Sequence, residues 1–357
     1  MSWESTGDGA ALAYRAGAQL QDLEMVQFHP TGMLWPPGVR GEGGILLNSE
    51  GERFMERYDP VKKDLSSRDV VARAIYREVL AGRGSPHGGA FLDITHRGAD
   101  YIKRKLPNMY DQFLSLADID ITRERMEVGP TIHYVMGGVR VEPGTAATGV
   151  PGLYAAGEVA GCLHGANRLG GNSLSDLLVF GKRAGEHAAE YVKGQSGEPQ
   201  VDQAELRAEI KRVCAPLERE RGENPFAVHE ALQATMGELV GISRTEADLK
   251  KALDQVLEHE ERAAKTRASG STVYNPGWHA CLDVMNMTRL AESMVRSAIE
   301  RRESRGAHWR LDYPDKDEAQ GRVNLIARKG PSGEMEIATA PVPQMPEELA
   351  RLFKEAK

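Results

Sequence analysis

The stretch PGLYAAGEVAGCLHGANRLGGNSLSDLLVFGKRAGEH, residues 151–187, organises the rest of the chain. Its pattern predicts a short apolar strand over residues 152–156, then a loop rich in glycine and asparagine, then a helix from about Ser175. Glu158 directly follows the predicted strand, at the carboxyl end where open α/β sheets bind ligands. A strand, loop and helix of this kind occur in many α/β proteins, so the pattern alone leaves the function open.

The loop and the start of the predicted helix carry features that favour a ligand. Glycines remove side chains, so the loop backbone can approach a flat or anionic group closely. Asn172, Ser173 and Leu174 lead into a helix N-terminus, whose free N–H groups favour anions. Arg168 lies inside the loop, and its planar guanidinium group suits a carboxylate. These residues are therefore candidates for binding a cofactor or a substrate.

Composition excludes several classes of protein. The chain has 357 residues, enough for two or three domains, and its 41% hydrophobic and 27% charged residues are typical of a globular protein. The net charge of −7 argues against a nucleic-acid partner. No apolar run approaches the length of a membrane span, and no signal peptide is visible. The three cysteines lack metal-type spacing, so we expect a reducing compartment and no metal site.

The literal strings of the chain are more specific than its patterns. GLYAAGE, HGANRLGGNSL and FGKRAG resemble the flavoprotein subunits of succinate dehydrogenase and fumarate reductase, a family that also includes L-aspartate oxidase. TGDG at 6–9, HPTG at 29–32, RDVVAR at 68–73, PTIHYVMGG at 130–138 and ESRGAH at 303–308 extend the resemblance. It implies an α/β (α+β) FAD-binding fold with a capping domain and a C-terminal helical bundle, and FAD as the cofactor.

One expected part of that fold is missing from the sequence. The family opens with a strand, a G-x-G-x-x-G turn and a helix that hold the FAD pyrophosphate, and only a few residues precede TGDG here. We therefore expect a chain without the N-terminal nucleotide-binding βαβ half. The expected domains are residues 1–28 as a remnant of the FAD-binding domain, 29–128 as the capping domain, 129–192 as the returning part of the FAD-binding domain, 200–304 as the helical bundle and 305–357 as a small C-terminal β and tail region.

The resemblance also implies roles for individual residues. Arg68 would exchange a proton with the substrate carbon, and Arg40 would belong to the relay that recharges it. His29, His133 and Arg168 would bind the two carboxylates of the substrate. Five residues complete the expected site as cofactor-binding groups: Asp8, Glu158, Asn172, Ser173 and Leu174.

The loop before Arg40 departs from the family pattern. Family members place Thr-Glu just before the Val-Arg-Gly string, and their relay is an Arg-Glu-Arg chain. Here Pro37 and Gly38 stand where the Glu and its follower would be, and neither Thr nor Glu is present. Since an arginine stays protonated under ordinary conditions, we expect proton delivery to Arg68 to be impaired.

The expected function is the interconversion of succinate and fumarate with FAD. Two alternatives stay open: an L-aspartate oxidase-like enzyme, and a non-catalytic remnant that acts as an interaction module. The family flavoprotein passes electrons to an iron-sulfur subunit, and from there to membrane anchors, and these are the expected partners. The expected location is cytoplasmic, on the inner face of the cell membrane through those partners.

Overall fold

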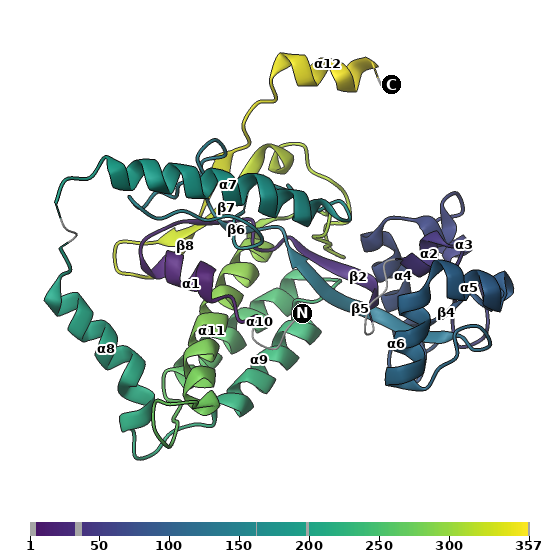
Figure 1. Cartoon of the computed structure of the whole chain (residues 1–357), viewed down its shortest axis with the longest axis horizontal. Coiled ribbons are helices and arrows are strands. Elements are labelled where there is room, and N and C mark those ends of the chain that lie inside the picture. Colours follow the sequence, from purple (N-terminus) through teal and green to yellow (C-terminus); the bar gives the residue numbers. More distant parts are fainter. Residues whose placement is uncertain (1–4, 33–37, 162, 198–199, 356–357) are drawn as a thin grey trace. The chain divides into compact units, whose positions relative to one another are not determined.

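A computed structural model describes residues 5–32, 38–161, 163–197 and 200–355 (Figure 1). The chain divides into two compact units. Unit 1 comprises Val26–Val135, and unit 2 comprises Ser2–Met25 together with Met136–Lys357. Each unit has its own sheet, so the chain leaves unit 2 after Met25 and returns to it at Met136.

The sheet of unit 1 is antiparallel, with strand order β2-β5-β4-β3. Alternation of buried and exposed positions is clearest in β4, where Ala90 and Leu92 face the core. Irregular register between β2 and β5 falls at Gln27/Phe28 and again between His29 and Gly32. The strands are β2 (Val26–Gly32), β3 (Ile45–Leu47), β4 (Ala90–Asp93) and β5 (Met126–Val135).

Helices cover this sheet and close its core. Val71, Ala74 and Ile75 recur at helical spacing and pack with Leu46 and Leu92 of the strands. Pro107 separates two helices because it cannot continue the first and suits the start of the second. The helices are α2 (Gly38–Gly41), α3 (Met55–Tyr58), α4 (Arg68–Leu80), α5 (Ala99–Lys105) and α6 (Pro107–Ala117), with single 3₁₀ turns at Lys63–Leu65 and Thr95–Arg97.

The sheet of unit 2 joins segments that are far apart in the sequence. Its order is β6-β1-β7-β8, so the short strand β1 pairs with β6 on one side and β7 on the other. β7 and β8 form an antiparallel hairpin in the expected C-terminal β region. The strands are β1 (Leu20–Gln21), β6 (Gly138–Val139), β7 (Val323–Lys329) and β8 (Met335–Pro341).

A helical bundle forms the larger part of unit 2. α9, α10 and α11 lie side by side (Figure 1) and share a core that includes Leu232, Leu249 and Val295. α1 packs on α11, where Asn286 donates to Asp8 Oδ1 at 2.6 Å. The helices of the unit are α1 (Asp8–Arg15), α7 (Asn172–Lys193), α8 (Gln203–Glu218), α9 (Pro225–Leu239), α10 (Glu246–Ala263), α11 (Pro276–Glu300) and α12 (Glu347–Glu355), with a 3₁₀ turn at Gln320–Arg322.

A buried charge network ties β1 to the segment after α11. The Arg301 guanidinium donates to Glu24 at 2.5 Å, to Asp22 at 2.9 Å and to Glu303 at 3.3 Å. His308 Nε2 lies 3.1 Å from the carbonyl oxygen of Arg301, and burial holds the pKa of His308 well below its ordinary value. The ESRGAH string is therefore used here to hold two segments of the unit together.

Three local predictions are wrong. Residues 152–156 form no strand, because within the described chain this segment has a single bridge, Ala147 with Tyr154, and no ladder. The turn residues 48–51 predict a hairpin over residues 45–54, but β3 pairs with β4 instead. The sequence predicts Thr6 or Asp8 as the cap of α1, but the N-cap is Gly7, whose φ of 78° suits a residue without Cβ.

Candidate active site

Two histidines face each other across neighbouring strands of unit 1. His29 lies in β2 and is buried, whereas His133 lies in β5 and is exposed. Their ring centroids are 5.2 Å apart with an angle of 60° between the ring planes. The pairing of β2 with β5 shifts register between His29 and Gly32, next to this pair of rings. The structure therefore brings together the two histidines that the sequence analysis selected.

The surroundings of His29 keep its imidazole neutral. Burial, and after it the nearby Arg68, His133 and Arg40, lower the pKa of His29 from its ordinary value of 6.5 to about 3. A neutral imidazole presents one N–H donor and one acceptor nitrogen. His29 is thus suited to donate a hydrogen bond to an anion at neutral pH without adding a full positive charge.

Arg68 and Arg40 supply the positive charge of this group. Arg68 is the first residue of α4 and is half-buried. That position places a cation at the positive end of the helix dipole, which is unfavourable without an anion nearby. Burial lowers the pKa of Arg40, and the charge of Arg68 lowers it further. An anionic substrate would stabilise the charge of Arg68 at the helix N-terminus and would oppose the lowering of the pKa of Arg40.

Asp64 is a residue of this group that the sequence analysis did not select. Its carboxylate is buried and accepts bonds from Leu46 N at 2.9 Å and from two nitrogens of Arg53 at 2.8 and 2.6 Å. The backbone held in this way presents the carbonyl oxygens of Asp64 and Ser66 to Arg40 Nη1, at 2.9 and 3.5 Å. The signal in the sequence was an acidic residue three positions before a helix cap, which is too common to be specific.

Arg168 and its loop belong to unit 2. Arg168 is buried, and its Nη1 lies 3.3 Å from Ser173 Oγ and 3.4 Å from the carbonyl oxygen of Leu169. His164 of the same loop lies 3.6 Å from Asp176 of α7, and both side chains are buried. Burial lowers the pKa of His164, while Asp176 opposes that change. Asp176 is a second charged residue that the sequence analysis did not select.

The residues expected to bind the cofactor also lie in unit 2. Asp8 is exposed in the first turn of α1, and Glu158 is exposed in a turn. Asn172, Ser173 and Leu174 form the first turn of α7, which begins three residues before the predicted start at Ser175.

The backbone before α7 has the open character that a bound FAD requires. Added Cβ atoms at Gly165 and Gly171 would meet no atom within 4 Å, and both residues have positive φ. Gly171 is the N-cap of α7 and offers no side chain, and the first turn of the helix contains no acidic residue. The N–H groups of residues 172–174 therefore suit an anionic or hydrogen-bond-accepting part of FAD.

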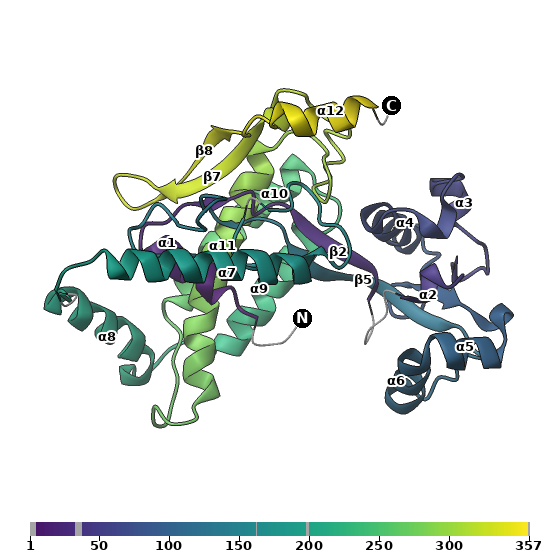
Figure 2. The ribbon, with the colours of Figure 1, turned by 45° about the horizontal axis from the view of Figure 1, so that its top comes forward.

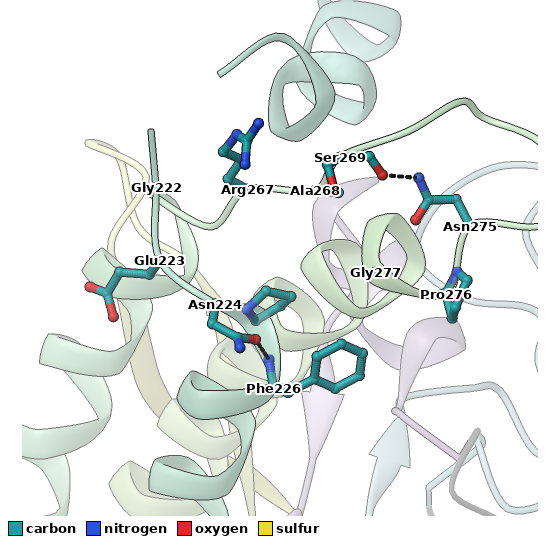
Figure 3. Close-up of a pocket in the computed structure, with 11 residues that line it drawn as sticks. Gly222, Glu223, Asn224, Phe226, Arg267, Ala268, Ser269, Asn275, Pro276 and Gly277 are labelled. Carbon is teal, nitrogen blue, oxygen red and sulfur yellow. Dashed lines mark hydrogen bonds between the residues drawn. The ribbon is translucent and has the colours of Figure 1, made fainter. Parts of the chain in front are cut away.

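A separate hollow lies in the helical bundle of unit 2 (Figure 3). Its volume is about 460 Å³, and it opens at the N-termini of α9 and α11. Asn224 accepts from Phe226 N at 2.9 Å, and Asn275 Nδ2 donates to the carbonyl oxygen of Ser269 at 3.0 Å. The lining contains none of the predicted site residues. Within the described residues, no group of three or more His, Cys, Asp or Glu side chains could hold a metal ion.

Comparison with known families supports the resemblance in two parts of the chain. A family described as "FAD binding domain" matches residues 1–174, and one described as "Fumarate reductase flavoprotein C-term" matches residues 229–351. A CoM/CoB fumarate reductase subunit of Methanothermobacter marburgensis is 42% identical over 332 residues, which cover 90% of this chain and 60% of the relative. The succinate dehydrogenase flavoprotein subunit of Coxiella burnetii is 38% identical, with 89% of this chain and 57% of the relative covered.

Solved structures of succinate dehydrogenase and fumarate reductase also resemble this chain. Sdh1 of Mycobacterium smegmatis in complex with UQ1 is 49% identical with a TM-score of 0.86, and the match covers 99% of this chain and 61% of that one. A variant of E. coli quinol fumarate reductase is 32% identical with a TM-score of 0.90, over 97% of this chain and 63% of that one. The chain thus spans about three fifths of the length of these relatives. It belongs to the family of succinate dehydrogenase and fumarate reductase flavoprotein subunits.

Proposed function

We propose that the chain contributes the dicarboxylate-binding and proton-transferring residues of a flavoprotein that interconverts succinate and fumarate. The observation that carries this proposal is the grouping of His29, His133, Arg40 and Arg68 in unit 1, with His29 held neutral among cationic groups. Relatives named succinate dehydrogenase and fumarate reductase favour this reaction over an L-aspartate oxidase-like one. The domain boundaries given above are part of the proposal.

The proposed roles follow from the chemistry of each side chain. His29 and His133 bind a substrate carboxylate, His29 as a neutral donor, and Arg168 binds a carboxylate through its guanidinium group. Arg68 exchanges a proton between its guanidinium group and the substrate carbon. When bound, FAD exchanges the hydride. Asp8, Glu158 and residues 172–174 are the proposed contacts to FAD.

Arg40 is the proposed source of the proton that returns to Arg68. Its charge is destabilised by burial and by Arg68, so its pKa is lowered and release of a proton costs less than from an ordinary arginine. The carbonyl oxygens of Asp64 and Ser66 hold its Nη1 in place. A relay that lacks the family's glutamate still depends on a group that can give Arg40 a new proton.

The visible absorption of the purified chain tests the proposed function. We expect the chain to bind added FAD and the flavin band to bleach when succinate is added. Arg68→Gln should keep the FAD band and lose the bleaching, because the substrate carbon then has no proton acceptor. A wild-type chain that ignores FAD, or one that binds FAD without bleaching, would favour the non-catalytic remnant.

Restoring the missing glutamate tests the relay. Inserting Thr-Glu immediately before Val39 should raise the rate of bleaching by about tenfold or more, the size of a typical acid–base contribution. Inserting Thr-Gln is the matched control, since it lengthens the loop equally without an ionisable group. Equal rates for the two insertions would contradict the proposed relay.

The partners and the location are proposed from the relatives. Membrane anchors would take up the electrons by way of an iron-sulfur subunit, and the protein would lie peripherally on the inner face of the membrane. No helix within the described residues combines the length and apolar character needed to cross a bilayer. Co-purification with an iron-sulfur protein from the membrane fraction tests this assignment.

A further inference from the structure

The ESRGAH string at residues 303–308 has no part in the proposed reaction, yet it contacts the loop that carries Arg168. Ala307 N donates to the carbonyl oxygen of Ala166 at 2.9 Å, and Ala166 lies two residues before Arg168. Both segments belong to unit 2. Figure 2 shows α11, which precedes the string, and α7, which follows the loop, running across each other's direction. The contact is therefore made by the connections at the ends of these helices.

Gly306 allows a close approach of the two backbones. A Cβ added at this position would lie 2.3 Å from the carbonyl oxygen of Ala166 and 2.6 Å from its carbonyl carbon. The φ of Gly306 is 58°, in the region that favours glycine. A backbone hydrogen bond alone does not require glycine, so the position combines a turn with an approach that no other residue type could make.

Short bonds and buried charge hold the segment from Glu303 to His308, which we call the 303–308 turn. Arg305 N donates to the carbonyl oxygen of His308 at 2.9 Å, and His308 N donates back to Arg305 at 3.0 Å. The Arg305 guanidinium donates to the fully buried carboxylate of Glu303 at 2.8 and 2.9 Å. That carboxylate also accepts from Asp317 N at 2.9 Å. A buried network with satisfied partners is rigid.

His308 anchors the last residue of the turn. Its imidazole is fully buried, with Nδ1 at 2.7 Å from Arg244 Nη1 and Nε2 at 3.1 Å from the carbonyl oxygen of Arg301. Since the guanidinium can only donate, Nδ1 accepts and the Nε2 proton is donated to Arg301. The 303–308 turn is thus fixed from two sides, by Glu303 and by His308.

The loop that carries Arg168 is less constrained. Gly165 and Gly171 have positive φ and open surroundings, and glycine loses more conformational freedom on folding than other residues. Two contacts of Arg168 Nη1, to Leu169 O at 3.4 Å and Ser173 Oγ at 3.3 Å, are long for hydrogen bonds. The place of the guanidinium group therefore depends on where the loop backbone is held.

We propose that the 303–308 turn is a platform that positions Arg168 for a substrate carboxylate, by holding Ala166 through Gly306 and Ala307. The inference rests on the proposed role of Arg168 in binding the substrate. Gly306 and Arg305 are positioning residues, since they act on Arg168 through the loop backbone.

Chemical labelling of arginine tests the platform without FAD or substrate. Phenylglyoxal modifies accessible guanidinium groups, and mass spectrometry of the 357-residue chain reports the rate at each arginine. Gly306→Ala should raise the labelling rate of the buried Arg168 by about tenfold, because the added methyl group displaces the loop. Arg310, which is fully buried and bonded to Ser304, should stay protected as in the wild type.

Gly333→Ala is the matched control. Gly333 lies in the connection between β7 and β8 with a φ of 91°, and an added Cβ would meet no atom within 4 Å. Alanine there has the unfavourable φ without the clash, so labelling of Arg168 should equal that of the wild type. Equal labelling of Arg168 in all three proteins would overturn the proposal. Faster labelling of Arg310 in Gly306→Ala would also overturn it, since the turn and not the loop would then give way.

A milder variant keeps the test informative if Gly306→Ala fails to fold. Arg305→Gln removes the bonds to Glu303 and to the carbonyl oxygen of Asp317, and should raise the labelling rate of Arg168 by about threefold. Arg302→Gln makes the same change at an exposed neighbour and should leave that rate unchanged. Equal rates in these two variants would contradict the platform.

Succinate separates this inference from the proposed function. Succinate should slow the labelling of Arg168 in the wild type, and Gly306→Ala should need about tenfold more succinate for the same protection. Equal protection at equal succinate would overturn the inference. Absence of protection in both, together with selective labelling of Arg168 in Gly306→Ala, would contradict the proposed binding role of Arg168 and still support the platform.

Discussion

His29 shows how one position combines burial with neighbouring charge. His29 belongs to strand β2, and Arg40 of α2 and Arg68 of α4 are among its charged neighbours. Burial and these charges hold the pKa of His29 at about 3. Since the folded pKa lies below the unfolded value, this neutral histidine contributes stability above about pH 6.5. That stability is lost as the pH falls from there toward 3.

A titration by NMR checks this assignment. The ring protons of His29 should show no inflection between about pH 8 and pH 5, where an ordinary histidine becomes charged. His87 is the internal control in the same unit, because its bond to Glu127 raises the pKa of His87 above its ordinary value. An inflection of His29 near that of His87 would contradict the assignment.

Part of the candidate site could be predicted from the sequence, because HPTG and PTIHYVMGG select His29 and His133, and the structure places the centroids of these two rings 5.2 Å apart. The binding and proton-transfer roles of the selected residues stay predictions. Asp64 acts through backbone carbonyls that it holds in place. No side-chain chemistry in the sequence distinguishes that role from an ordinary surface carboxylate.

Helix caps differ within this chain, and the difference is measurable. Thr245 caps α10 by accepting from Asp248 N at 3.2 Å and donating to Asp248 Oδ2 at 2.6 Å. Thr245→Ala should lower the free energy of unfolding by about 1 kcal/mol. Amide hydrogen exchange in the first half of α10 should accelerate by about fivefold.

Ser67 serves as the matched control, because it is the N-cap of α4 and its side chain makes no capping bond. Ser67→Ala should change exchange in α4 by less than about twofold. Similar acceleration in both helices would show that residue type, and not the bonded geometry, sets the contribution of a cap.

Helices could be predicted from the sequence far better than strands. The bundle helices follow from periodicity within each segment, which depends on nearby residues alone. Residues 152–156 looked like a strand, yet a strand needs a ladder partner that the segment itself cannot specify. Likewise β3 pairs with β4, more than 40 residues away, and the local turn at Asn48–Gly51 misled the prediction.

The stability of unit 2 should depend on pH through the ionisation of Asp22. Burial, and after it the nearby Glu24, raise the pKa of Asp22 to about 7. A folded pKa above the unfolded value means that stability is fully present below about pH 4 and is lost as the pH rises through 7. The expected slope for this one group reaches about 1.4 kcal/mol per pH unit between those values.

Asp22→Asn isolates this contribution. The free energy of unfolding of wild type and variant, measured by urea at several pH values, should differ by an amount that changes between about pH 5 and 7 and stays constant above about 8. Groups that titrate in both proteins, His29 among them, cancel in this difference. A difference that is independent of pH would show that Asp22 is ionised throughout.

The order of the strands in unit 2 has a consequence for synthesis on the ribosome. β1 lies between β6 and β7, so the sheet joins residues 20–21, 138–139 and 323–329. All four strands of unit 1 have left the ribosome once residue 135 has emerged, and that unit can fold early. Unit 2 must wait for β7 and β8, near the end of the chain. Loss of residues 323–341 would therefore leave unit 1 intact and remove β7, one of the two strands that pair with β1, which lies far from it in the sequence.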